Sequence, residues 1–186
     1  MSTLKIHTIE SAPEGSKESL KGSIKAFGML PNLHGVLAGS PATLEAYKKL
    51  HELFSTKTAF NAEEKTVIWQ TINVEHECHY CVPAHTAIAG MMEIDGSITE
   101  ALRNDETLAD NKLQVLKETT LEIVRTRGNL SKSSSKAFFS AGYTQQQLIE
   151  IILGVSQKTI SNYLNHIAET PVDEPFQKFA WEKANA

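Results

Sequence analysis

Residues 75–85 constrain this chain more than any other stretch, because they hold both of its cysteines and three of its seven histidines. Cys78 and Cys81 are three residues apart, and His85 follows four residues after Cys81. Residues at these spacings share one face of a helix. A helical conformation would therefore bring the two thiols close enough for a disulfide and place the imidazole beside Cys81.

The start of that helix is indicated by Pro83. Proline is tolerated in the first turn, where amide hydrogens have no intrahelical acceptor, but costs about 3 kcal/mol deeper in a helix. We therefore expect the helix to begin between about Cys78 and Val82. Both sulfurs would then lie at a helix N-terminus, where the partial positive charge favours thiolate. The position at the helix end favours Cys78 as the attacking thiol, whereas His85 favours Cys81. We predict that Cys81 attacks, because His85 could accept its proton.

The same residues permit two other interpretations. Both cysteines could be inert, buried apolar side chains, which is common for free cysteine. They could also bind zinc, although structural zinc sites usually draw their ligands from two separated segments. The zinc set would be Cys78, Cys81 and His85, with His76 or His79 as the fourth ligand. A c-type haem is excluded, because a valine and not a histidine follows the second cysteine.

Composition limits the partners of the protein. The chain of 186 residues is 41% hydrophobic and carries a net charge of −4. These values are typical of a globular protein and argue against nucleic acid or an anionic membrane as the main partner. The N-terminus lacks the apolar segment of a secretion signal, and no run of about 18 apolar residues predicts a membrane span. We therefore expect a cytoplasmic location, where a paired-cysteine motif is reactive and not a structural disulfide.

Hydrophobic periodicity predicts the fold class. No stretch alternates apolar and polar residues as a half-buried strand does, so we predict an all-α, single-domain protein of about seven to nine helices. Residues 1–16 are expected to be loosely ordered, and residues 17–186 to form the domain, with the core of the motif at about 61–92. Helix starts are indicated by Ser40–Pro41 and by capping boxes at Asn61–Glu64, Ser97–Glu100 and Thr144–Gln147. The last long helix follows the apolar residues Leu148, Ile151, Ile152, Val155, Ile160, Leu164 and Ile167.

The central motif carries a family resemblance. The pattern E-x-x-C-x-Y-C-x-x-A-H resembles the core motif of the alkylhydroperoxidase D-like branch of the carboxymuconolactone decarboxylase superfamily. The matching residues are Glu75, Cys78, Tyr80, Cys81, Ala84 and His85. Residues 27–33 (F-G-x-x-P-N-L) and the segment 161–173 also resemble that family, so the likeness covers roughly residues 27–173. It implies an all-α fold and a homo-oligomer, often a trimer or a dimer of trimers.

The resemblance also implies roles for individual residues. In the family the second cysteine attacks peroxide and the first resolves the product, which agrees with Cys81 and Cys78 in these roles. Some members carry a relay glutamate twelve residues before the first cysteine, but that position is Thr66 here. We therefore assign the carboxylate that would orient His85 or relay its proton to Glu75. Candidate pocket residues are Tyr80, His79 and His166.

These observations lead to three hypotheses about function. The first is a thiol-dependent peroxidase or disulfide oxidoreductase that reduces small alkyl hydroperoxides, needs no haem, flavin or metal, and is reduced by an external dithiol protein or small thiol. The second is an acid/base decarboxylase or lactone-type enzyme that uses His85 and Glu75. The cysteine pair argues against it, because decarboxylase relatives in the superfamily generally lack that pair. The third is a non-enzymatic structural or zinc-binding protein.

Overall fold

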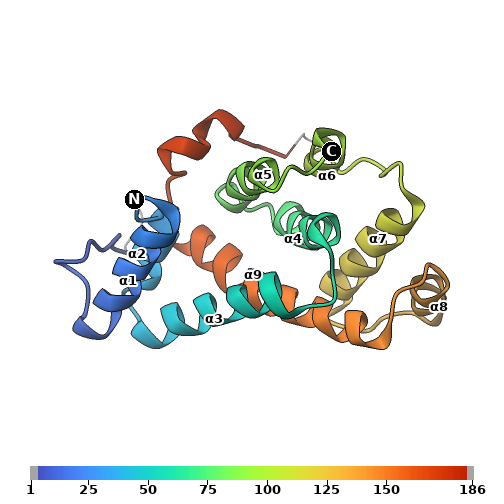
Figure 1. The fold of residues 1–186 in the computed structure, drawn as a ribbon, viewed down its shortest axis with the longest axis horizontal. Helices are drawn as coiled ribbons and strands as arrows, with labels where there is room; N and C mark the ends of the chain where they lie inside the picture. Colours follow the sequence, from blue (N-terminus) through green and yellow to red (C-terminus); the bar gives the residue numbers. More distant parts are fainter. Residues whose placement is uncertain (1–3, 184–186) are drawn as a thin grey trace.

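The computed structural model describes residues 4–183, and within this range it contains nine α-helices, one 3₁₀ helix and no strand (Figure 1). The predicted all-α fold is therefore confirmed. The helices are α1 (Glu14–Phe27), α2 (Asn32–Leu37), α3 (Pro41–Lys57), α4 (Ala62–Glu75), α5 (Cys81–Met91), α6 (Gly96–Arg103), α7 (Asn111–Thr126), α8 (Lys132–Ser140), α9 (Gln145–Ala168) and the 3₁₀ helix η1 (Glu174–Phe179).

Most helices begin where the sequence places a cap. Ser40 accepts a hydrogen bond from the third residue of α3. Asn61 and Glu64 form a reciprocal capping box at the start of α4, and Thr144 and Gln147 form another at the start of α9. Each box satisfies two backbone amides that would otherwise lack a partner. Local capping chemistry therefore sets the N-termini of the three helices that support the central motif.

The predicted capping box of the short helix α6 is wrong. Its cap is Asp95, whose carboxylate accepts the N–H of Ser97 at 2.8 Å, and the helix begins at Gly96. Aspartate and serine are both favoured helix caps, and the aspartate side chain can accept the amide N–H two residues further along the chain. The start is therefore two residues earlier than the predicted capping box implies.

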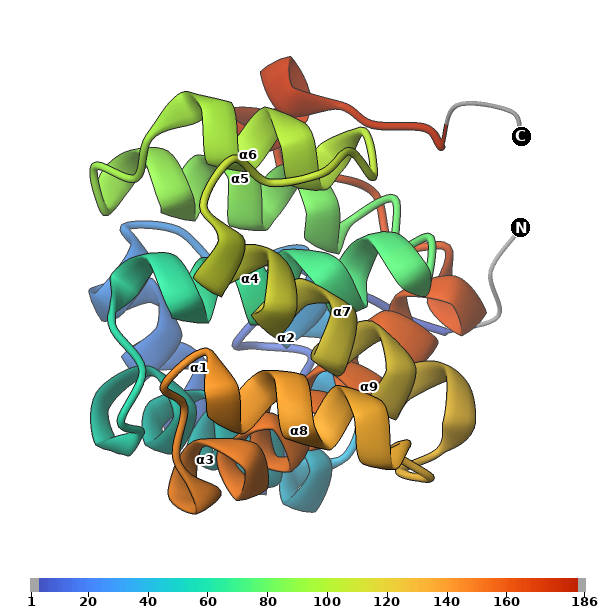
Figure 2. The same ribbon diagram turned by 90° about the vertical axis from the view of Figure 1, so that its right-hand side faces the viewer.

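The helices form layers around α4. In Figure 2, α5 and α6 lie above α4, and α3, α8 and α9 lie below it. α7 packs along α4, and α9, the longest helix, packs along α3 and also contacts α4. The loop between α4 and α5 lies against the C-terminal half of α9, where side chains of that helix reach it. The layers thus bring the central motif next to a helix that begins more than sixty residues later in the chain.

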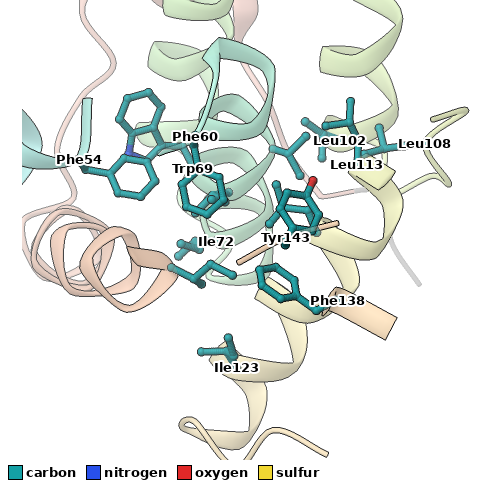
Figure 3. Packing of buried hydrophobic residues seen from close by; sticks show 14 residues of the cluster. Phe54, Phe60, Trp69, Ile72, Leu102, Leu108, Leu113, Ile123, Phe138 and Tyr143 are labelled. Carbon is teal, nitrogen blue, oxygen red and sulfur yellow. The ribbon is translucent and has the colours of Figure 1, made fainter. Parts of the chain in front are cut away.

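The larger hydrophobic core holds α4 in place (Figure 3). Trp69 of α4 packs on Phe54 of α3 with ring centroids 5.1 Å apart. Phe138 of α8 stacks on Tyr143, just before α9, with centroids 4.6 Å apart. Buried residues of α6 and α7 complete the cluster. Because helices on several sides of α4 pack against it, the end of α4 gives the following loop a fixed support.

A second core cluster surrounds the two cysteines. Its buried members are Ala12, Leu20, Leu33, Leu37, Ala38, Leu44, Tyr47, Cys78, Tyr80, Cys81 and Ala84. The segment before α1 contributes to this side of the molecule, since the N–H of His7 donates to the carbonyl of Gly35 at 3.0 Å. Residues 14–16 of the segment that we expected to be loosely ordered form the first turn of α1, and residues 1–3 lie outside the described residues.

None of the helices in residues 4–183 combines the length and the apolar character that crossing a membrane requires.

Candidate active site

The two cysteines lie at the junction between α4 and α5. Cys81 is the first residue of α5, within the predicted range for the helix start, and Cys78 lies in the preceding loop. The N–H of Cys78 donates to the carbonyl of Asn73 at 2.9 Å. The N–H of Cys81 donates to the sulfur of Cys78 at 3.3 Å. Backbone hydrogen bonds therefore fix the first sulfur in front of the first turn of α5.

A chain of buried amide side chains fixes the loop from behind. Asn162 of α9 donates to Asn73 of α4 at 3.1 Å, and Asn73 donates in turn to Gln70 at 2.9 Å. All three side chains are fully buried. His76 binds the amide oxygen of Asn162 through Nδ1 at 3.0 Å. Since buried amides are costly to leave unpaired, this network favours one arrangement of the loop relative to α9.

Both cysteines are free and buried, and their thiols differ in acidity. Burial alone would raise the pKa of Cys81, but a hydrogen bond from Cys78, the charge of Lys158 and the amide of Asn165 lower it to about 5. The hydrogen bond to Cys81, together with burial, raises the pKa of Cys78. The Nδ2 atom of Asn165 lies 3.3 Å from the sulfur of Cys81 and 3.8 Å from that of Cys78. The site thus favours a thiolate on Cys81 and a thiol on Cys78.

His85 and Lys158 meet inside the protein. Both side chains are buried, and the Nζ atom of Lys158 lies 3.1 Å from Nε2 of His85. Burial and the charge of Lys158 lower the pKa of His85 well below 6.5, so the imidazole is neutral near pH 7. Among residues 4–183, the hydrogen bond of this imidazole is to Lys158 and not to Cys81. The expected contact between His85 and the attacking thiol is therefore replaced by a contact with a lysine of α9.

A pocket of about 260 Å³ opens onto this group. Its lining is mostly apolar and aromatic and consists of Ala26, Phe27, Met29, Pro31, Leu33, His34, Tyr47, His51, Tyr80, Cys81, Ala84, His85, Ile88, Met91, Lys158, Pro175 and Phe176. Cys81 is part of the lining and Cys78 is not. A molecule in the pocket would therefore meet the second cysteine first.

Two further histidines in the pocket wall are neutral. Burial lowers the pKa of His34 to about 3 and that of His51 to about 4. The ring of His51 stacks on Trp69 at 5.7 Å, and Trp69 contacts His85 at 5.0 Å. Gln157 of α9 holds His51 through Nδ1 at 3.1 Å. His34 and His51 thus add flat, uncharged rings to the lining, which suit an apolar or aromatic ligand.

The other predicted pocket residues have separate partners. The hydroxyl of Tyr80 donates to the carboxylate of Asp173 and accepts the N–H of Leu33 at 3.3 Å, so this hydroxyl already has partners although Tyr80 is part of the pocket lining. His79 binds the carbonyl of Thr170 through Nε2 at 3.0 Å. The exposed His166 binds the carbonyl of His76 at 2.7 Å. His79 and His166 therefore tie the loop to the C-terminal end of α9 and do not line the pocket.

Glu75 lies outside the site, contrary to our expectation. Both of its carboxylate oxygens are bound by the guanidinium of Arg125 at 2.8 Å, on the side of α4 that faces α7. The side chains of successive helix residues point about 100° apart. Glu75, the last residue of α4, therefore points toward α7, whereas the loop that follows carries the chain to the cysteines. Glu75 cannot orient His85 from this position.

The zinc set permitted by the sequence does not assemble. His76 and His79 are bound to Asn162 and Thr170, as described above. Within residues 4–183, no group of three or more histidine, cysteine, aspartate or glutamate side chains is arranged to hold a metal ion.

Lys158 and Asn165 are site residues that we did not predict. They lie on one face of α9, whose buried members are Gln147, Ile151, Gly154, Gln157, Lys158, Ser161, Asn162, Asn165 and Ala168. By contrast, Ile152 and Ile167, which the apolar pattern includes, are exposed. In the sequence, the polar residues of this face recur three and four positions apart. Polar side chains are mostly exposed, however, so this spacing did not identify the face as buried.

The sequence matches no known family profile and no curated protein sequence. The fold, however, matches solved structures. The alkylhydroperoxidase AhpD core of an uncharacterized peroxidase-related protein from Ralstonia eutropha JMP134 superimposes with a TM-score of 0.83 at 17% identity, covering 94% of each chain. An uncharacterized peroxidase-related protein from Silicibacter sp. TM1040 gives a TM-score of 0.79 at 15% identity, covering 94% of this chain and 92% of its own.

A third similar structure is a debrominase. A cysteine-to-alanine variant of Bmp8 in complex with 2,3,4-tribromopyrrole gives a TM-score of 0.80 at 15% identity, covering 96% of this chain and 95% of its own. At such identities the likeness establishes the fold and leaves the chemistry to be argued from the residues of this chain.

Proposed function

We infer that this chain, which has the alkylhydroperoxidase D-like fold of the carboxymuconolactone decarboxylase superfamily, is a thiol-dependent hydroperoxide reductase. The observation that carries the proposal is the asymmetry of the cysteine pair. Cys81 lines the pocket and its pKa is lowered to about 5, whereas Cys78 lies behind it as a thiol. A thiolate facing the substrate and a thiol next to it are the two groups that such a reaction needs.

The reaction proceeds in three steps. The thiolate of Cys81 attacks the terminal peroxide oxygen, so that an S–O bond forms, the O–O bond breaks and an alkoxide leaves to become an alcohol. The thiol of Cys78 then attacks the sulfenic acid; its proton and the hydroxyl leave as water, and a disulfide forms. An external dithiol reduces this disulfide by exchange and is itself oxidised.

The pocket favours small, largely apolar hydroperoxides. Its lining is aliphatic and aromatic, and burial keeps its histidines neutral. Apolar walls supply most of the binding free energy for such ligands, while a charged substrate would lose its hydration on entry. We therefore expect an aryl or branched alkyl hydroperoxide to be a better substrate than hydrogen peroxide.

The other hypotheses have less support. The acid/base decarboxylase requires a carboxylate next to His85, and Glu75 is bound to Arg125 instead. Removal of a halogen from a small aromatic ring is a second candidate, because the stacked rings of Tyr47 and His51 line the pocket in a fold shared with a debrominase. A brominated pyrrole is therefore included in the test.

The test is a thiol count on the reduced protein before and after an equimolar amount of cumene hydroperoxide, and again after a dithiol reductant. We expect both thiols to be lost and then to return. Cys81→Ser should abolish the loss, whereas Cys78→Ser should consume one equivalent and leave a sulfenic acid that a dimedone reagent captures. Thiols that persist with the hydroperoxide would contradict the proposal, and bromide release from the pyrrole would favour the second candidate.

A further inference from the structure

Within residues 4–183, a fully buried lysine in the pocket lining has no carboxylate to neutralise it. Lys158 is 0% exposed, and no aspartate or glutamate belongs to the pocket lining within residues 4–183. The salt bridges of the described residues do not include it. A buried ammonium without a counter-charge is strongly disfavoured. An anion must therefore lie nearby if Lys158 is charged.

The sulfur of Cys81 is placed to be that anion. It accepts from the amide of Asn165 at 3.3 Å and from the thiol of Cys78. Hydrogen-bond donors on a sulfur favour its ionised form. Cys81 and Lys158 both line this pocket, and His85, which lies one turn after Cys81 on α5, contacts the lysine. The two hydrogen-bond donors thus act on the sulfur of Cys81, and Lys158 is the cation of the same pocket.

The groups that face Lys158 from the neighbouring helices do not provide another charge. His85 on α5 and His51 on α3 are kept neutral by burial, and Tyr47 on α3 has its pKa raised by burial. The thiol of Cys78 also has its pKa raised. Asp173 lies on the C-terminal segment, where its carboxylate is bound by Tyr80 and by the N–H of Asn32, and is not in the pocket lining.

The contact between Lys158 and His85 excludes the alternative that His85 is the base that deprotonates Cys81. The imidazole Nε2 faces Nζ of Lys158 at 3.1 Å. When the ammonium donates to Nε2, the imidazole proton is on Nδ1, and Nε2 has no free lone pair to accept the proton of Cys81. The histidine then acts by orienting the lysine.

We propose that Lys158 is the cation that holds Cys81 as a thiolate and the acid that protonates the alkoxide leaving group. The second half of this proposal rests on the proposed function, and the first half does not. No other lysine or arginine lines the pocket in the described part of the chain.

The proton balance of the cycle closes through this residue. When the O–O bond breaks, the ammonium of Lys158 gives one proton to the alkoxide and becomes an amine. Disulfide formation uses the proton of the Cys78 thiol and releases water. The external dithiol then supplies two protons with its two electrons, one to each cysteine sulfur. The new thiol of Cys81 passes its proton to the amine, which restores the thiolate and the ammonium.

The test is the pH dependence of Cys81 alkylation by iodoacetamide in the reduced protein, with the alkylated residue located by mass spectrometry. In the unchanged protein we expect the midpoint near the lowered pKa of about 5. Lys158→Met removes the charge from a side chain of similar length, and loss of a close opposite charge should move the midpoint up by roughly 1–3 pH units. Lys158→Arg keeps a positive charge, so its midpoint should stay close to that of the unchanged protein. An unchanged midpoint in Lys158→Met would overturn the proposal.

Two further variants serve as controls for the effect of Lys158 on the midpoint. Lys48→Met is the matched control, since Lys48 is a half-buried lysine of α3 that binds Ser19 and Ser23 and lines only an outer cavity, and its midpoint should stay unchanged. His85→Ala removes the contact that orients the lysine but keeps the charge of the lysine, so the midpoint should rise by less than in Lys158→Met. A rise equal to that of Lys158→Met would assign the thiolate to His85 and refute the proposal. This assay needs no turnover, so a protein that fails the peroxide test still reports on Lys158.

Discussion

The close packing of α9 against α3 and α4 at Gly154 provides a test of the geometry that supports the site. A Cβ atom added at Gly154 would lie 2.8 Å from Cε2 of Phe54 and 3.1 Å from Cγ2 of Ile68. Carbon atoms in ordinary contact are about 3.5–4.0 Å apart. Lys158 lies one turn further along the same face of α9, so the approach at Gly154 also sets how deeply the lysine enters the pocket.

The magnitude follows from two opposing effects. Phe54 and Ile68 are 0% exposed, so neither can move without disturbing the main core, and overpacking of this kind costs about 1–3 kcal/mol. Alanine in place of a helical glycine gains about 0.5–1 kcal/mol, because the unfolded chain loses freedom. We expect Gly154→Ala to lower the free energy of unfolding by about 0–2.5 kcal/mol, the difference between these two ranges.

The measurement is urea unfolding followed by far-ultraviolet circular dichroism, with the denaturant slope compared between variants. Gly90→Ala is the matched control, since Gly90 lies in α5 with nothing within 4 Å of the added atom. It should raise the free energy of unfolding by up to about 1 kcal/mol. If Gly154→Ala were stabilised as much as Gly90→Ala, the close approach of α9 would be refuted, and with it the basis for placing Lys158.

Three further predictions follow from single contacts. Asn165→Ala removes a donor to a charged sulfur worth about 1.5–3 kcal/mol, so the alkylation midpoint of Cys81 should rise by about 1–2 pH units; an unchanged midpoint would exclude this hydrogen bond. Glu75→Gln should leave hydroperoxide-driven thiol loss unchanged within about twofold and cost less than about 1 kcal/mol of stability, because the lost ion pair is partly exposed; a large loss of turnover would return this carboxylate to the mechanism. Burial raises the pKa of Asp173 from 3.8, although Tyr80 opposes this shift. A carboxyl group with a raised folded-state pKa stabilises the fold at low pH, and that contribution is lost as pH rises through the raised value. Unfolding measured from pH 3.8 upward should therefore show a decline in stability that Asp173→Asn lacks, and parallel curves would disprove the raised pKa.

Much of the fold could be predicted from local signals. The capping boxes at Asn61 and Thr144 act over three residues, and the structure confirms both. The turn into α5 is also local, because Pro83 restricts where a helix can begin. The exception at α6 arises from a competing local cap, Asp95. Interactions between residues two or three positions apart, such as these caps, can be predicted from a single sequence.

The candidate site was predictable only where its residues are close together in the chain. The spacing of Cys78, Cys81 and His85 places them on one side of a helix start. In the structure Cys81 and His85 line the pocket, and the sulfur of Cys78 accepts the N–H of Cys81 without lining it. The side to which Glu75 points was not predictable, because it depends on where α7 packs. A rotation of one residue along a helix changes the direction of a side chain by about 100°.

The sequence by itself determined an all-α fold and a cysteine pair followed by a histidine at the start of a helix. Only the tertiary structure decided which groups touch the sulfurs. Asn165 is 84 residues from Cys81 in the chain, and Lys158 is 73 residues from His85. Such contacts depend on how α9 lies across α4 and α5, and that packing arises from the summed burial of many side chains. The face of α9 that reaches the site is polar and buried, which no rule of amphipathic periodicity identifies without its partner helices.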